Sequence, residues 1–124
     1  MSRLFGKSEQ RRAQETAAQA ECERLSRLPA ADLAAEILPA FRAGQKHPAN
    51  GPLGASEWLM AEYPRGVAAR CVQQLRQPVA AAIQALEHAG LLHQVLGGEG
   101  RRTRFAITSV GETALAENSA RSYL

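Results

Sequence analysis

The stretch that decides the fold is PVAAAIQALEHAGLLHQVLGGEGRRTRFAIT, residues 78–108. Its first part repeats apolar side chains at the helical spacing i, i+3, i+4 and i+7, at Val79, Ala82, Ile83 and Leu86. Pro78 suits the first position of a helix, and Gly90 suits the position just after its last turn. We therefore expect a helix over residues 78–89 with its apolar face in the core.

After Gly90 the hydrophobic period changes to two residues, which is typical of strands. Residues 91–96 and 103–108 form two such runs around the Gly- and Arg-rich segment 97–102. In the second run Phe105 and Ile107 alternate with charged or small neighbours, which separates an apolar face from a charged one. This pattern predicts a β-hairpin with a basic tip.

Helices are expected on both sides of this stretch. After Pro29 an apolar stripe runs toward Gly44, and we expect the helix to kink or end early at Pro39. Residues 45–54 are rich in Pro, Gly and Asn and predict a loop. Beyond the hairpin, residues 110–118 have the pattern of a closing helix.

Two short helices are expected between the loop and Pro78. Ser56 is a suitable N-cap for a helix that uses Trp58 as a core anchor and that Pro64 terminates. Arg65-Gly66 is expected to form the turn that follows. Val67–Leu75 has apolar residues at helical spacing, and Arg76-Gln77 is expected to interrupt it.

The N-terminal segment, residues 8–27, is rich in Gln, Glu, Arg and Ala and lacks Gly and Pro, which predicts a helix. Its apolar stripe is thin, consisting of Ala18, Cys22 and Leu25. The helix could fray, dock on its own domain or dimerise with a second copy. We divide the chain into a helical or partly disordered extension, residues 1–28, and a globular domain, residues 29–124.

The composition is consistent with one helical domain that binds a polyanion. The 124 residues suffice for one core, and 45% hydrophobic with only 5% aromatic residues favours helices over sheets. Lys and Arg number 15 against 12 Asp and Glu, a formal charge of +3. This mild excess is compatible with a nucleic-acid partner.

The two cysteines, Cys22 and Cys71, lie far apart in the sequence and lack zinc-finger spacing, so we expect neither a disulfide framework nor a zinc site. Cys71 is expected to be buried, whereas Cys22 lies on a polar stretch and is expected to be exposed. The sequence shows no signal peptide and no membrane-spanning run. We expect a protein of the reducing cytoplasm with no membrane partner.

The order short helix, turn, long helix, glycine, hairpin and closing helix resembles the winged helix-turn-helix family over Pro29–Asn118. Residues 78–92, PVAAAIQALEHAGLL, are similar to the end of a recognition helix entering a wing. Residues 107–115, ITSVGETAL, are similar to the strand-to-helix junction of MarR-type and PadR-type regulators. The resemblance implies a mainly α fold with a small β-hairpin. It also implies a homodimeric transcription regulator that binds double-stranded DNA selectively.

In that family pattern Val67–Leu75 would cross the DNA backbone, with Ala69 at the helix crossing, and Pro78–Ala89 would enter the major groove. The wing would lie on the backbone or minor groove. The residues expected at DNA are Arg76, Gln77, Ala80, Ala81, Gln84, Arg101, Arg102 and Arg104. Ordinary polar surface is the alternative for the glutamines, and a charge-protected hairpin edge is the alternative for the arginines.

Other functions have weaker support in the sequence. Winged helices also bind proteins, so an interaction module without DNA binding stays open. The glycines of residues 97–100 precede a strand and do not open a helix, as a phosphate loop requires. His88 and His93 lack a third ligand nearby. We expect no enzyme activity, no metal and no cofactor.

Overall fold

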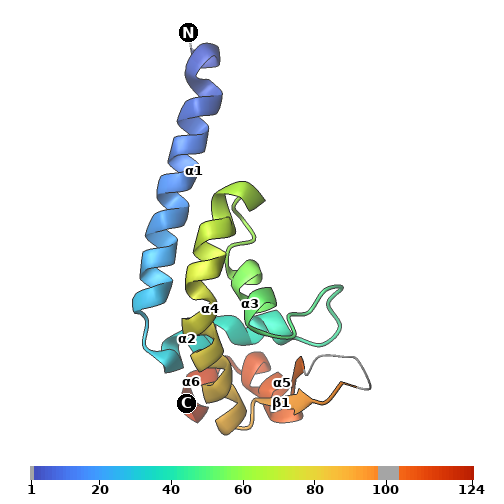
Figure 1. Ribbon diagram of the computed structural model, residues 1–124. Helices are drawn as coiled ribbons and strands as arrows, with labels where there is room; N and C mark the ends of the chain where they lie inside the picture. Colours follow the sequence, from blue (N-terminus) through green and yellow to red (C-terminus); the bar gives the residue numbers. More distant parts are fainter. Residues whose placement is uncertain (1, 98–103) are drawn as a thin grey trace.

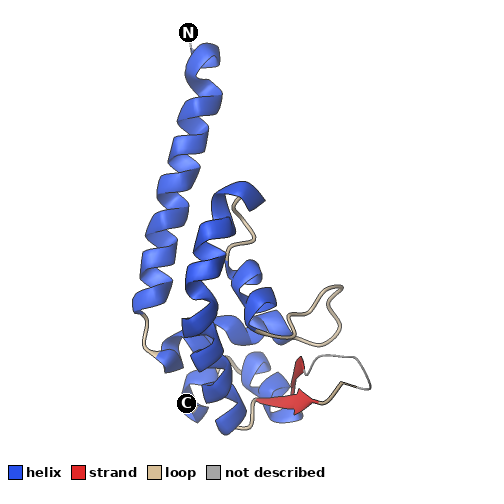
Figure 2. Cartoon of the chain, in the orientation of Figure 1, coloured by secondary structure: helices blue, strands red, loops and turns tan. Residues whose placement is uncertain are grey.

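A computed structural model describes residues 2–97 and 104–124 (Figures 1 and 2). The elements are α1 Ser2–Arg27, α2 Ala30–Ile37, the 3-10 helix η1 Leu38–Phe41, α3 Pro52–Leu59, α4 Arg65–His88, β1 Leu92–Val95, β2 Arg104–Ile107, α5 Ser109–Ala116 and α6 Ala120–Tyr123. The protein is therefore mainly helical with a small antiparallel hairpin, which confirms the coarse fold class expected from the sequence.

The core is built around α4, which runs through the middle of the molecule with α1 on one side and α3 on the other (Figure 1). One face of α4 is buried along its whole length, at Ala68, Cys71, Val72, Leu75, Val79, Ala82, Ile83 and Leu86. Leu33 and Ile37 of α2 pack into the same cluster. Burying this apolar area supplies most of the free energy that holds the helices together.

The sequence-based break at Arg76-Gln77 is wrong, because α4 is one continuous helix of 24 residues that contains Pro78. A proline inside a helix removes one backbone donor and strains the preceding turn. Here the apolar stripe continues across it without a change of period, and Leu75 and Val79 are fully buried on either side. Burial of this stripe outweighs the local cost of Pro78 and keeps the helix intact.

The end of α4 agrees with the sequence-based prediction. Gly90 has a φ of +80°, the left-handed conformation that favours glycine after a helix. Its N–H bonds to the Glu87 carbonyl at 3.0 Å, and the Leu91 N–H bonds to the Leu86 carbonyl at 2.9 Å. These two bonds form a Schellman motif, which directs the chain straight into β1.

The hairpin pairs Leu92 with Ile107 at one end and Val95 with Arg104 at the other. Phe105 and Ile107 pack against the core and Arg104 is exposed, as the alternation predicts. The two strands are therefore confirmed, with slightly shorter bounds than expected. The loop residues 98–103 lie outside the described residues.

Thr108 joins the hairpin to the closing helix, whose position the sequence also predicts. Its Oγ1 accepts a hydrogen bond from the Gly111 N–H at 3.0 Å, which caps α5. The same hydroxyl donates to the Gly90 carbonyl at 2.6 Å. A Cβ atom on Gly111 would collide with the Leu91 carbonyl oxygen. The start of α5 is thus packed directly on the Gly90-Leu91 turn that follows α4.

For the region before α4, the sequence predicts the helices correctly but not all of their boundaries or the roles of their residues. The helix after Pro29 ends at Ile37 and continues through Pro39 as η1, which confirms the expected early end. Ser56, however, is no cap: it lies inside α3, where its hydroxyl donates to the Pro52 carbonyl at 2.7 Å. Ala55 and Ser56 form the buried face of α3, so Trp58 faces outward with 38% of its surface exposed. Trp58 is therefore not a core anchor.

The helix predicted for residues 8–27 is confirmed as part of α1, whose N-terminal half extends beyond the other helices (Figure 1). The thin stripe of Ala18, Cys22 and Leu25 is buried, and it packs on α4 of the same chain. At the C-terminal end of α1, Arg24 makes a two-pronged ion pair with Glu36 of α2 at 3.0 and 3.1 Å. Of the three alternatives given for this helix, the structure therefore shows the docking of α1 on its own domain.

Both expectations for Cys22 were wrong. Its side chain is buried, and it forms a disulfide with Cys71 across the α1–α4 contact, with the two Cα atoms 5.7 Å apart. The pairing could not be predicted from the sequence, because residues 22 and 71 come together only through the packing of α1 along α4. The expectation that Cys71 is buried is confirmed.

Candidate nucleic-acid interface

The solvent-facing side of α4 carries the five residues of this helix that the sequence predicts at DNA. Arg76, Gln77, Ala81 and Gln84 are exposed, and Ala80 is half-buried. They lie opposite the buried stripe, because in an amphipathic helix the apolar residues share one face and the residues between them face solvent. The structure thus brings them together on one helix.

Their place on that helix differs from the expectation. They occupy the middle and the C-terminal half of α4, because the helix begins at Arg65 rather than at Pro78. Pro64 is the N-cap residue, and its carbonyl accepts hydrogen bonds of 2.9 Å from Val67 and Ala68. The sequence signal for this start was the pair Tyr63-Pro64, since a proline is favoured just before or at the start of a helix.

The N-terminal half of α4 adds exposed side chains that the sequence analysis missed. Arg65, Arg70 and Gln73 face solvent, in a segment that was assigned to a turn and to a backbone-crossing helix. Ala69 is also exposed, and it lines the groove between α3 and α4. Arginine and glutamine are the side chains that read guanine and adenine by paired hydrogen bonds.

Two clefts border this exposed face. On the α1 side, a cleft of about 330 Å³ is lined by Gly66, Arg70 and Cys71 of α4. On the α3 side, a groove of about 520 Å³ is lined by Arg65, Ala69 and Gln73 together with residues of α3. Between the two clefts Ala69, Arg70 and Gln73 of α4 are exposed to solvent.

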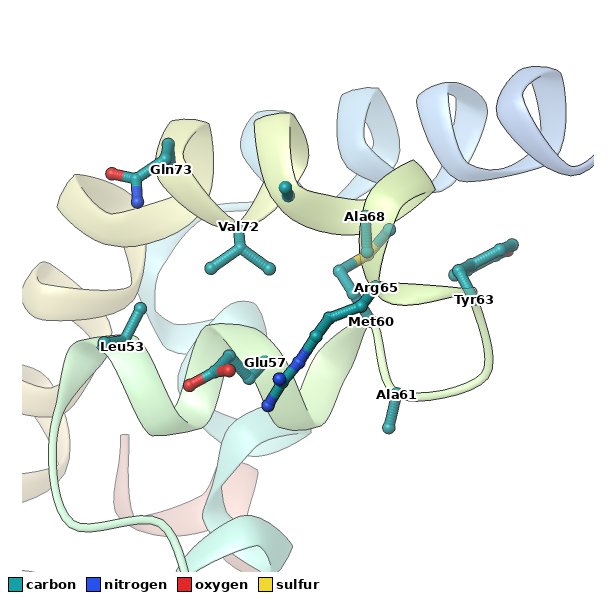
Figure 3. Close-up of a pocket in the computed structure, with 10 residues that line it drawn as sticks. Leu53, Glu57, Met60, Ala61, Tyr63, Arg65, Ala68, Val72 and Gln73 are labelled. Carbon is teal, nitrogen blue, oxygen red and sulfur yellow. The ribbon is translucent and has the colours of Figure 1, made fainter.

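The α3–α4 groove has an apolar floor and charged edges (Figure 3). Val72 and Ala68 point into it from α4, and the buried Met60 closes its base. The Arg65 side chain extends across the groove toward α3, on the side where the Glu57 carboxylate lies (Figure 3). The groove therefore offers apolar contact at its centre and opposite charges at its rim.

A fixed turn joins α3 to α4. The Met60 N–H bonds to the carbonyls of Ser56 and Glu57, and the Tyr63 N–H bonds to the Met60 carbonyl at 3.1 Å. Residues 60–64 thus hold a short helix against the start of a long one.

A second basic surface, which the sequence analysis also missed in part, lies beside the hairpin. Lys46 and His47 of the loop after η1 and Arg104 of β2 line a cleft of about 450 Å³, and none of its described lining residues is acidic. All three side chains are exposed. Gln45 holds the loop by donating to the carbonyls of Pro39 and Ala40. Arg101 and Arg102, expected in the wing, lie outside the described residues.

The arginines of these surfaces differ electrostatically from Arg24. Hydrogen bonds to Glu36, and then to Glu21, raise the pKa of Arg24 and hold that side chain in an ion pair. Within residues 2–97 and 104–124, no carboxylate lies at ion-pair distance from Arg65, Arg70 or Arg104. Their charges are thus available to an anionic partner.

No protein-family model, no curated protein and no solved structure was found to match the chain. No helix in the described part is both long and apolar enough to span a membrane. The same residues contain no cluster of three His, Cys, Asp or Glu side chains that could hold a metal ion.

Proposed function

We propose that the chain is a winged helix-turn-helix protein that binds double-stranded DNA with sequence preference. In this proposal α3 and α4 are the helix-turn-helix pair, α2 is the helix before them, and β1–β2 is the wing. The hydrogen bond from the Phe105 N–H to the Asn50 carbonyl at 2.9 Å supports this topology. It pairs the segment just before α3 with the second hairpin strand, as a short third strand would.

The observation that carries the DNA proposal is the exposed face of α4 between the two clefts. In a helix-turn-helix pair the N-terminal part of the second helix reaches the base edges. Arg65 and Gln73 supply suitable donors there, and Ala69 supplies a methyl group for thymine. The residues farther along, Arg76 and Gln77, would follow the groove. Ala80, Ala81 and Gln84 would complete the contact.

The surface beside the hairpin is proposed to bind phosphates. Lys46, His47 and Arg104 present basic side chains next to one another, and such contacts contribute affinity without reading bases. Arg101 and Arg102 belong to the same proposal on the sequence alone. Selectivity then comes from α4, and affinity for any duplex comes mainly from the loop and the wing.

We further propose that the protein acts as a homodimeric transcription regulator, by occupying its site rather than by catalysis. A single helix with three alanines on its outer face offers few base contacts. Two copies on a repeated half-site would add their contacts.

The direct test of selectivity is to enrich duplexes from a random library with the full chain and then to measure their affinities. Arg65→Ala and Gln73→Ala should each lose about 1–3 kcal/mol of discrimination against the wrong base. Gln14→Ala on the exposed part of α1 is the matched control and should bind as the parent does. No enriched sequence, or equal discrimination by all variants, would refute base reading by α4.

One observation favours a second function, the docking of a protein. The α3–α4 groove is apolar at its floor, and Leu53 at its edge keeps 45% of its surface exposed. Exposed apolar side chains around a groove are typical of partner contacts. If the chain binds a protein and not DNA, Leu53→Ser should weaken that complex, and the basic residues near the hairpin should matter little.

A further inference from the structure

The contact between α1 and α4 contains the two cysteines of the chain. Cys22 lies on α1 and Cys71 on α4, and they form a disulfide that closes a loop of 49 residues in sequence separation. Their Cα distance of 5.7 Å falls in the usual range for disulfides. Only 1% of Cys22 and 4% of Cys71 is exposed, so bulk solvent hardly reaches either sulfur.

A cleft nevertheless leads to one of the two cysteines. The cavity of about 330 Å³ between α1 and α4 is lined by Cys71 but not by Cys22. Glu15, Ala18 and Gln19 form its α1 wall, and Arg70 stands on its α4 wall. Glu15 and Arg70 thus place one negative and one positive side chain at the cleft, which leaves it without a net charge of either sign. The two sulfurs therefore differ in access, although both are buried.

We propose that Cys22–Cys71 is a reversible thiol–disulfide exchange site, reduced by a dithiol that enters this cleft and attacks Cys71. The redox state of the pair determines how firmly α1 is held on α4. This proposal concerns the α1–α4 contact and does not depend on DNA binding.

The exchange has two balanced steps. A thiolate of the dithiol forms a bond to the Cys71 sulfur as the Cys22–Cys71 bond breaks, and Cys22 leaves as a thiolate that takes a proton from water. The second thiolate of the dithiol then attacks its own partner sulfur in the mixed disulfide and displaces Cys71, which is protonated in turn. The dithiol is oxidised to a disulfide by two electrons, and the protein gains two thiols.

The structure also contains a hydrogen-bond acceptor for one of the two thiols of the reduced state. Cys22 Sγ lies 3.2 Å from the Oε1 atom of Gln74, so the released thiol has a hydrogen-bond acceptor within reach. Without the covalent link, the described contacts that anchor α1 on the domain are the buried Ala18, Leu25 and reduced Cys22 and the Arg24–Glu36 ion pair. An ion pair between such exposed side chains contributes little to stability. Reduction should therefore loosen α1 more than any other helix.

The first test uses the wild-type full chain, equilibrated with dithiothreitol at a series of dithiol-to-disulfide ratios. Cysteines are counted by maleimide labelling after acid quenching and denaturation. We expect no free thiol in the oxidised protein, two in the reduced protein, and a single reversible transition between them. Two free thiols at every ratio, or a disulfide that forms only between chains, would overturn the proposal.

The second test compares two variants under native conditions with glutathione disulfide. In Cys22→Ser the remaining Cys71 faces the cleft and should form a mixed disulfide at least about tenfold faster than Cys22 does in Cys71→Ser. Equal rates would refute the cleft as the route of attack.

Hydrogen exchange on oxidised and reduced wild type shows the effect on α1 without any substitution. Amides of α1 should exchange faster after reduction, while those in the second half of α4 should not change. Unchanged exchange in α1 would refute the control of α1 docking by the redox state.

Discussion

The backbone N–H of Phe105 donates a 2.9 Å hydrogen bond to the carbonyl of Asn50, which joins the second hairpin strand to the loop before α3. The same loop bears Lys46 and His47, and the strand bears Arg104. This bond lies at a cleft where basic side chains from two distant parts of the sequence come together. The loop is also held by the Ala49 N–H, which donates to the Ala40 carbonyl at 2.8 Å, and by the two hydrogen bonds of Gln45.

Removing the basic side chains of this cleft should weaken the binding of all duplexes alike. For the double variant Lys46→Ala/Arg104→Ala, the slope of log affinity against log salt should flatten by about one unit for each cation removed. Arg12→Ala, which removes an exposed charge from α1, is the matched control. Fluorescence anisotropy over a salt series measures both quantities, and an unchanged slope in the double variant would remove these residues from the interface.

Ile83→Asp should unfold the domain. Ile83 is 1% exposed in the centre of the buried face of α4, and an unpaired buried carboxylate costs several kcal/mol, on the order of the whole stability of a domain. Gln84→Asp changes the next residue on the exposed side and should cost less than about 1 kcal/mol. Thermal unfolding followed by circular dichroism checks both, and similar melting temperatures would show that this face of α4 is not buried.

Pro78→Ala should stabilise the protein. The substitution restores a backbone donor in the middle of α4 and removes the ring from the preceding turn, while it gives the unfolded chain more freedom. The net gain should be about 1–2 kcal/mol in the free energy of unfolding, because the two effects oppose each other. Urea unfolding measures it. A loss of stability would mean that α4 requires Pro78, for example as the start of a separate helix.

Gly111→Ala should destabilise the junction between α4 and α5 by about 1–3 kcal/mol. The added Cβ would meet the Leu91 carbonyl and the Ile107 side chain, and backbone can give way only if α5 moves. Gly6→Ala is the control, since nothing lies within 4 Å of the added atom there. Equal melting temperatures for Gly111→Ala and the parent would contradict the close packing of α5 on the end of α4.

The parts of the fold that the sequence predicts correctly are those that local chemistry determines. Gly90 marks the end of α4 because only a residue tolerant of positive φ suits that position. The alternation around Phe105 predicts the hairpin, and the pattern of residues 110–118 predicts the closing helix, which the structure has at Ser109–Ala116. These signals act over a few residues and need no knowledge of the tertiary structure.

The start of α4 was mispredicted because two local rules conflicted with a longer pattern. Pro78 suits a helix start, and Arg65-Gly66 suits a turn, yet the apolar period runs from Ala68 to Leu86 without a break. The free energy gained by burying that stripe exceeds the local cost of Pro78, so one helix forms over the whole length of the pattern. The exposed Arg65 and Gln73 were missed for this reason.

Other features depend on contacts between segments that are distant in the sequence, and no local sequence pattern predicts those contacts. Cys22 lies beside Cys71 because α1 packs along α4, and Lys46 and Arg104 line one cleft because the loop before α3 lies beside β2. Trp58 faces outward because α3 packs on the core through Ala55 and Ser56. Each depends on the start or the packing of a helix, which the residue types alone do not determine.

The most direct measurement of the central claim is the affinity of the full chain for a random-sequence duplex across a salt series. If α4 and the hairpin bind DNA, a complex forms at low salt and log affinity falls linearly with log salt, with a slope of about −0.9 for each phosphate contacted. Absence of binding at the lowest salt concentration, or an affinity that does not change with salt, would contradict DNA binding by this protein.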